Sequence, residues 1–305
     1  MKTKILLLTL VHSLCLRMNL KRKIKFLFFT FLYVLFSNNL FSADIKPIQS
    51  RNYENLTSFI HELNSDFTVT NIGNVQCEDS FGIYDYPVYK ISYIKSESYQ
   101  NIDSRKYLFL CGLHGNEPAP VFGIKNIIQE INEGKIKIPN NTQVDFIFIM
   151  NPFGFERNYR YCSNHTDPNR DLNTQTTKEM QILTQATKEK YDLVIDFHEA
   201  TCDGTFFYAY NQKGKKYAKN ILNYLKKQNV LLENEYVDVI LKVKNGLLYS
   251  AFYAQWYMKL KGSVTTGMYF KDRGIPLVFT VETPKRGNFE ERCRIIKLIF
   301  EKVIS

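Results

Sequence analysis

The sequence has few cysteines, and their spacing excludes two classes of small, cross-linked fold. Five of the six cysteines follow residue 43, and none forms a CxxC pair. An odd number without that spacing argues against a zinc finger and against a dense disulfide framework. We expect mostly buried free thiols, with one bridge between Cys162 and Cys202 as the alternative, because both lie near candidate site residues.

Acidic residues are absent from the first 43 positions, which carry seven Lys or Arg. This segment therefore accounts for +7 of the formal net charge of +10, which leaves an ordinary +3 for the rest of the chain. No base-stacking or helix-turn-helix signature accompanies the charge. We therefore expect no nucleic-acid partner.

No apolar run is long enough to span a bilayer. Residues 26–36, FLFFTFLYVLF, form an eleven-residue run, about half of the roughly 20 residues that a transmembrane helix needs. Basic residues precede the run and the small pair Ser42 and Ala43 follows it, as in a secretory signal peptide, with Met18 as an alternative start. We expect residues 1–43 to be a signal peptide or an N-terminal anchor, the only contact with a membrane. The rest of the protein is then periplasmic, bound in the cell envelope, or secreted.

The remaining sequence contains no repeat, low-complexity tract or long linker, so we expect a single catalytic domain over residues 44–305. Strand-like and helix-like segments alternate along it, and several strands are continuously apolar. This pattern predicts an α/β fold with three α/β/α layers and a twisted mixed, largely parallel sheet. Strands are expected in 67–73, 86–94, 106–112, 144–151, 191–197, 206–208 and 277–282. Helices are expected in 53–64, 118–131, 176–190, 215–227, 247–260 and after Gly287.

Polar side chains occur where the predicted strands end. His114 and Glu117 follow one strand, Asn151 and His198 end two others, and Glu282 closes a fourth. Ligands of open α/β sheets bind at the carboxyl edge of the strands, so these residues are expected to meet on one rim.

The residue types on this rim suit one catalytic zinc ion. Zinc binds imidazole nitrogen and carboxylate oxygen, and a catalytic site uses three protein ligands. We expect His114, Glu117 and His198 to be these ligands, with Gly112 and Gly115 allowing the backbone to bend between them. Zinc activates water at ordinary pH, and a separate carboxylate must accept the proton. Glu282 is the candidate general base.

The stretch NPFGFERNYRYCSNHTDPNRDLN, residues 151–173, is rich in arginine. A guanidinium donates two parallel hydrogen bonds to a carboxylate, so Arg160 and Arg170, with the neighbouring Asn169, are candidates to bind an anionic substrate. Arg157 is interpreted as a support for the loop. Glu199, beside His198, is interpreted either as a partner of the metal ligands or as a solvated side chain.

Five motifs in order, GLHGNEPA, NPFGFERNYR, DPNRDLN, DFHEA and FTVETP, resemble the zinc carboxypeptidase (carboxypeptidase A-like) family and its succinylglutamate desuccinylase and aspartoacylase relatives. The resemblance covers about residues 85–290. It implies a zinc metallocarboxypeptidase or related amide hydrolase that acts on peptides or peptidoglycan-derived substrates. The roles that it implies are zinc ligation by His114, Glu117 and His198, polarisation of the scissile carbonyl by Arg160, binding of the substrate carboxylate by Asn169 and Arg170, and general base catalysis by Glu282.

The sequence departs from the family pattern before Glu282. The substrate-capping tyrosine cannot be aligned without a gap, which leaves Tyr257 and Tyr269 as candidates, and the position that selects the substrate side chain lies near Gly267. An N-acyl amino acid deacylase is the alternative function, although export argues against it. A catalytically silent binding protein is the third hypothesis.

Overall fold

The computed structural model describes residues 46–94, 105–237, 241–249 and 252–305. The predicted signal segment, residues 1–43, lies outside these described residues. Within them, no helix combines the length and the apolar character needed to cross a membrane.

The described residues form a mixed sheet with helices on its two faces. Ten strands have the sheet order β1-β2-β4-β3-β5-β10-β6-β9-β8-β7. Their bounds are β1 Phe67–Asp79, β2 Gly82–Tyr93, β3 Arg105–Cys111, β4 Thr142–Ile147, β5 Leu193–Ala200, β6 Phe206–Ala209, β7 Tyr236–Val237, β8 Leu241–Lys244, β9 Leu247–Tyr249 and β10 Leu277–Pro284. The helices are η1 Gln49–Arg51, α3 Tyr53–Thr57, η2 Ser58–Glu62, α4 Pro118–Asn132, α5 Pro152–Glu156, η4 Pro168–Arg170, α6 Lys178–Ala186, α7 Gln212–Lys227, α8 Phe252–Leu260, α9 Thr266–Asp272 and α10 Phe289–Ile304.

The centre of the sheet is parallel, and an antiparallel pair joins it to each flank. Strands β4, β3, β5 and β10 run in the same direction, whereas β2 joins β4, and β6 joins β10, in antiparallel pairs. The central strands are covered on both faces, which explains their continuous apolar sequences. The predicted α/β fold with a mixed sheet is confirmed, and its parallel part is the centre that carries the candidate site residues.

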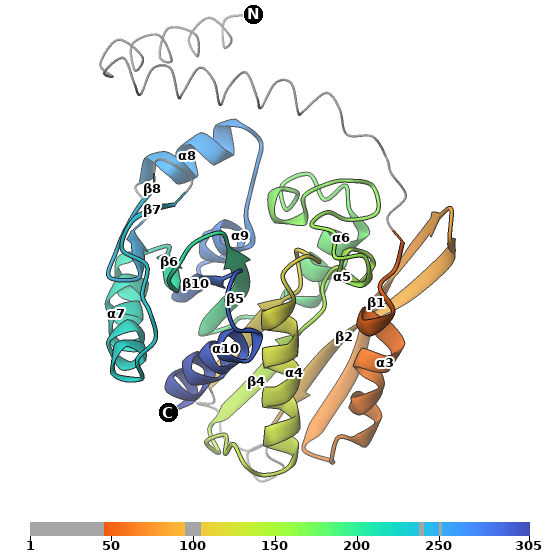
Figure 1. The fold of residues 1–305 in the computed structure, drawn as a ribbon, viewed down its shortest axis with the longest axis horizontal. Coiled ribbons are helices and arrows are strands. Elements are labelled where there is room, and N and C mark those ends of the chain that lie inside the picture. Colours follow the sequence, from red (N-terminus) through yellow and green to blue (C-terminus); the bar gives the residue numbers. More distant parts are fainter. Residues whose placement is uncertain (1–45, 95–104, 238–240, 250–251) are drawn as a thin grey trace, which may run out of the picture. The chain divides into compact units, whose positions relative to one another are not determined.

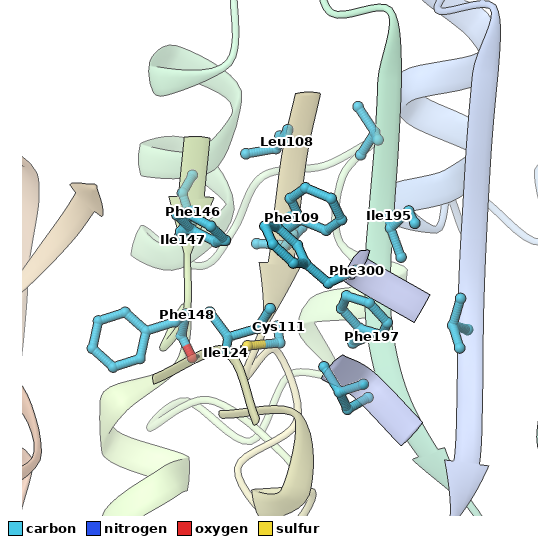
Figure 2. Close-up of a cluster of buried hydrophobic side chains, with 14 of the residues drawn as sticks. Leu108, Phe109, Cys111, Ile124, Phe146, Ile147, Phe148, Ile195, Phe197 and Phe300 are labelled. Carbon is cyan, nitrogen blue, oxygen red and sulfur yellow. Dashed lines mark hydrogen bonds between the residues drawn. The ribbon is translucent and has the colours of Figure 1, made fainter. Parts of the chain in front are cut away.

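Helices α4 and α10 lie side by side on one face of the sheet (Figure 1), and α10 also contacts α7. Phe109, Phe146 and Phe197, from three neighbouring strands, point to Phe300 of α10 (Figure 2), with ring centroids of Phe109 and Phe300 4.8 Å apart. Because successive side chains of a strand alternate between faces, His198, the residue after Phe197, points to the opposite face. Helix α9 packs against β5 and β10 on that face.

Two sequence predictions need correction. Residues 247–249 were expected to begin a helix but form strand β9, and the helix α8 begins only at Phe252. Strand β9 pairs with β6 and so extends the sheet. Pairing with a neighbouring strand outweighs the helical spacing of the local sequence. The alternative of a bridge between Cys162 and Cys202 is wrong, because both are free thiols, and the Cys202 sulfur instead contacts the carbonyl oxygen of Gly204 at 3.2 Å.

Candidate active site

The loop after β3 places His114 and Glu117 together. Gly112 begins the loop with φ +73°, a conformation that favours glycine. Gly115 is required for a different reason than the expected bend: a Cβ atom there would lie 1.9 Å from the carbonyl carbon of Gly154. Glu117 then occupies the N-cap position of α4. As a result, the Nδ1 atom of His114 lies 2.8 Å from a Glu117 carboxylate oxygen.

His198 joins this pair from the end of β5. Its Nδ1 atom lies 2.8 Å from the second carboxylate oxygen of Glu117 and 3.1 Å from Nδ1 of His114. All three side chains are buried, and one ligand atom from each lies within 4.8 Å of the others. The structure therefore brings together the three residues that the sequence analysis proposed as metal ligands.

Two aspartates that sequence reasoning missed orient the imidazole rings. Asp167 lies 3.1 Å from Nε2 of His114, and Asp196 lies 2.9 Å from Nε2 of His198. Each carboxylate accepts the Nε2 hydrogen, so each Nδ1 presents its lone pair to Glu117. Three electron-pair donors facing one another cannot hydrogen-bond without an added proton or cation. The donor set thus fits a divalent cation such as zinc.

The charges around the rings point to the same conclusion. Burial opposes protonation of His198, but Asp196 and Glu117 together raise its pKa well above the ordinary value. For Glu117, burial is likewise opposed by His114 and His198, which hold the pKa of its carboxyl below the ordinary range. The cluster therefore attracts positive charge at its centre, and a bound cation would take the place of the proton.

Glu282 lies beside the metal-ligand cluster. It pairs in register with His198 across the parallel strands β10 and β5, so the two side chains project from the same face of the sheet. The side chain is partly exposed. Desolvation, assisted by the negative charges of Glu117 and Asp196 and opposed by His198 and Arg160, raises the pKa of Glu282 to about 8. A general base is most effective when its pKa is close to the working pH.

Three predicted site residues of the loop occupy different environments: Arg160, expected to polarise the carbonyl, and Asn169 and Arg170, expected to bind the substrate carboxylate. Arg160 is one-third exposed and lies 2.9 Å from Asp167 and 3.5 Å from Glu117, so it stands at the entrance to the cluster. Asn169 is buried, with its side-chain nitrogen 3.4 Å from Nε2 of His198. Arg170 is exposed and donates to the carbonyl oxygen of Asn169 at 2.8 Å.

Asp167 connects these residues. Its side chain caps the short helix η4 by accepting from the backbone N–H of Asn169 at 2.9 Å. Its second oxygen accepts from Arg160, while the first contacts His114. The Asp167 carboxylate therefore fixes the His114 ring, the guanidinium of Arg160 and the loop that carries Asn169. Its place two residues before Asn169 in DPNR is the signal that could have identified it.

Four further residues named in the sequence lie around the site or outside the described part of the chain. Arg157 is buried and pairs with Asp79 at 2.9 Å, so it supports the loop as expected. Glu199 is buried and pairs with Arg292 at 2.5 Å, on the opposite face from His198, and it is not a solvated side chain. Tyr269 receives a hydrogen bond from Arg273 at 3.2 Å on the outer side of α9. The side chain of Tyr257 is outside the described part of the chain.

A family model matches the part of the chain that carries His114, Glu117 and His198. Residues 103–234 match the family model described as the succinylglutamate desuccinylase/aspartoacylase catalytic domain. Among curated proteins, no sequence matches the chain.

Solved structures share the fold at low sequence identity. A candidate metallopeptidase from Shewanella denitrificans OS217 has a TM-score of 0.65 at 17% identity, over 85% of this chain and 92% of that one. A metallo-carboxypeptidase from Burkholderia cenocepacia has a TM-score of 0.63 at 13% identity, over 85% and 69%. A metallo-carboxypeptidase from Pseudomonas aeruginosa, in complex with (2-guanidinoethylmercapto)succinic acid, has a TM-score of 0.60 at 14% identity, over 85% and 68%.

The matched model describes a catalytic domain of hydrolases, so the expectation of a hydrolytic enzyme is confirmed at that level. The predicted resemblance to the zinc carboxypeptidase-like family and its succinylglutamate desuccinylase and aspartoacylase relatives is supported by the family model over residues 103–234, and the solved structures share the fold that the resemblance implies.

Proposed function

We propose that the protein is a zinc-dependent hydrolase that cleaves an amide bond next to a substrate carboxylate. The observation that carries this proposal is the convergence of His114, Glu117 and His198 beside Glu282. His114, Glu117 and His198 would hold one zinc ion. When bound, zinc supplies Lewis-acid chemistry, which polarises a carbonyl group and acidifies water.

The residues of the chain divide the remaining work. Glu282 accepts a proton from the attacking water and delivers it to the amide nitrogen as the carbon–nitrogen bond breaks. Arg160, next to Glu117, is placed to stabilise negative charge on the carbonyl oxygen. Asn169 and Arg170 would bind the carboxylate, and the exposed guanidinium of Arg170 is already held next to Asn169 by its hydrogen bond to the Asn169 carbonyl oxygen. Asp167 and Asp196 hold the imidazole rings in place.

A metallocarboxypeptidase acting on peptides or wall stem peptides is the preferred form of this proposal. The similar solved structures named as metallo-carboxypeptidases support it. The basic, then apolar, N-terminal sequence supports a location outside the cytoplasm, in the periplasm or envelope or as a secreted protein. Peptides and wall fragments are substrates found in these locations.

An N-acyl amino acid deacylase is the alternative, and the family model that matches residues 103–234 favours it. Both activities release an amino acid, but the acyl part of the substrate is a peptide for a carboxypeptidase and a short acyl group for a deacylase. Mass spectrometry of purified, zinc-loaded protein with ordinary peptides, wall-derived peptides and short N-acyl amino acids separates them. Loss of a C-terminal residue from peptides supports the first form. Cleavage of acyl amino acids alone supports the second.

Metal analysis provides the test of the shared mechanism. We expect one zinc per chain, loss of hydrolysis with a chelator, and loss of zinc in His198→Ala. The matched control is His61→Ala, because His61 is exposed on η2. If His198→Ala retains one zinc ion, His198 is not a zinc ligand. If the unmodified protein binds no zinc and cleaves none of the compounds, the third hypothesis, a catalytically silent binding protein, is favoured.

A further inference from the structure

Tyr210 lies between strand β10 and the start of helix α9, next to the elements that carry Glu282 and contact Asn169. The side chain is only 8% exposed. Its hydroxyl lies 3.0 Å from Oγ1 of Thr280 and 3.4 Å from Oγ1 of Thr265. Thr280 precedes Glu282 by two positions in β10, so both side chains project from the same face of the sheet. The phenol is thus held at Thr280, two residues before the predicted general base on the same face of β10.

The first turn of α9 packs against the other side of this ring. Gly267 lies so close that a Cβ atom there would be 2.1 Å from Cζ of Tyr210. The residue before it, Thr266, donates its backbone N–H to Oδ1 of Asn169 at 2.9 Å. One turn of helix therefore contacts the predicted carboxylate-binding residue and Tyr210 together. The residues that make these two contacts, Thr266 and Gly267, are adjacent in the chain.

A substrate bound for hydrolysis must pass between these groups. Its carboxylate would lie at Asn169 and its scissile amide near Glu282, so the Cα atom that carries the carboxylate lies between them. The side chain on that Cα points either to solvent or toward β10 and α9. The second direction is occupied by the ring of Tyr210, whose hydroxyl is fixed by two threonines.

We propose that Tyr210 restricts the residue released by the enzyme to one with a small side chain, glycine or alanine. This inference rests on the proposed function and names the substrate class of the same site. Gly267 and Tyr210 act as a pair, because only a residue without a side chain at position 267 allows the Tyr210 ring to lie against the first turn of α9. A larger terminal side chain would have to displace a buried ring in a close-packed environment.

The proposal predicts the substrate profile of the unmodified enzyme. We would measure kcat/KM for acetylated dipeptides and N-acyl amino acids ending in Gly, L-Ala, D-Ala, Leu or Phe. The ratio of the better alanine substrate to the phenylalanine substrate should be about 100-fold or more, since each surplus group in a closed pocket costs about tenfold or more. Equal rates, or a preference for Leu or Phe, would overturn the proposal.

Variants identify Tyr210 as the cause. Tyr210→Ala should lower the alanine-to-phenylalanine ratio at least tenfold, whereas Tyr210→Phe keeps the ring and should keep the preference. Tyr217→Ala is the matched control, because Tyr217 packs on Phe279 at the opposite face of the sheet. An unchanged ratio in a folded Tyr210→Ala protein would overturn the assignment. If Tyr210→Ala does not fold, the milder Tyr210→Leu is measured in the same way.

Binding separates failure of this inference from failure of the proposed function. Zinc-loaded Glu282→Gln protein should bind acetylglycine or acetylalanine more tightly than acetylphenylalanine in calorimetry. Tighter binding of acetylphenylalanine would overturn the role of Tyr210 alone. If the protein neither hydrolyses nor binds any of these compounds, the proposed function is overturned, and this inference with it.

Discussion

Glu282 and His198 face each other in register across the parallel strands β10 and β5. This pairing sets a carboxylate beside a buried imidazole without any loop between them. Because strand geometry fixes the spacing of paired side chains, the sheet itself positions the predicted base relative to the predicted ligand. The loops around the site then add the remaining groups.

Glu282→Gln tests whether this carboxylate transfers protons. The amide has nearly the same shape but cannot accept a proton, so we expect a loss in kcat of about 10²–10⁴-fold. Zinc content should remain one ion per chain, because Glu282 is outside the ligand set. Steady-state kinetics and metal analysis make the measurement, with the exposed Glu62→Gln as control. Unchanged turnover would exclude Glu282 as the base.

The same residue should shape the pH dependence of folding stability in the metal-free protein. The folded environment raises the pKa of Glu282 to about 8 from an ordinary value of 4.5. Between these pH values the folded state holds a proton that the unfolded state has released, so this group destabilises the fold progressively as pH rises. Glu282→Gln removes this pH-dependent contribution to the free energy of unfolding.

Urea unfolding in the presence of a chelator, at several pH values from 5 to 9, measures the effect. We expect the stability of Glu282→Gln relative to the unmodified protein to increase with pH up to about 8 and then to level off. A stability difference that does not vary with pH would mean that the carboxyl of Glu282 is ionised throughout.

Sequence reasoning was most successful where residue type and strand position agreed. The proximity of His114, Glu117, His198 and Glu282 could be predicted because each combines a chemically distinctive side chain with the end of an apolar strand, and strand ends meet by the topology of a parallel sheet. The central strands and the helices α4, α7 and α10 were predicted for the same reason, since their apolar spacing is regular.

The features that were missed depend on contacts between distant residues. Asp167 and Asp196 are ordinary aspartates in the sequence, and only the fold shows that each accepts a hydrogen from a different imidazole. The exposed position of Arg170 and the free thiols of Cys162 and Cys202 likewise depend on loop paths that no local pattern specifies. Strand β9 formed where local spacing favoured a helix, because pairing with β6 determined its conformation.

Gly115 provides a test of the loop that carries two of the predicted ligands. In Gly115→Ala the added methyl group would overlap the backbone of Gly154, so the loop must move and the His114–Glu117 pair with it. We expect at least a tenfold loss of zinc affinity, measured by competition with a chromogenic chelator.

Gly134→Ala is the control for general glycine effects. Gly134 has φ +73° but nothing within 4 Å of an added Cβ. It should cost about 1 kcal/mol of stability through backbone strain and leave zinc affinity unchanged. Equal zinc affinity in both variants would show that the close contact at Gly115 does not position the ligands.

Asp196 tests whether the orientation of His198 contributes to metal binding. Its carboxylate accepts from Nε2 of His198 and from the hydroxyl of Thr266, and both contacts are buried. Outer carboxylates of this kind typically contribute 10- to 100-fold to metal affinity. We therefore expect Asp196→Ala to weaken zinc binding by about that factor. Thr266→Val, which removes only the second contact, should have a smaller effect, and the exposed Asp272→Asn should have none.

Two measurements distinguish metal binding from a purely structural role of Asp196. Chelator competition gives the zinc affinity of each variant independently of turnover. Urea unfolding of each metal-free variant gives the midpoint that reports the stability of the fold. If Asp196→Ala lowers that midpoint but leaves zinc affinity intact, Asp196 supports the fold alone, and His198 is oriented by the strand on which it lies.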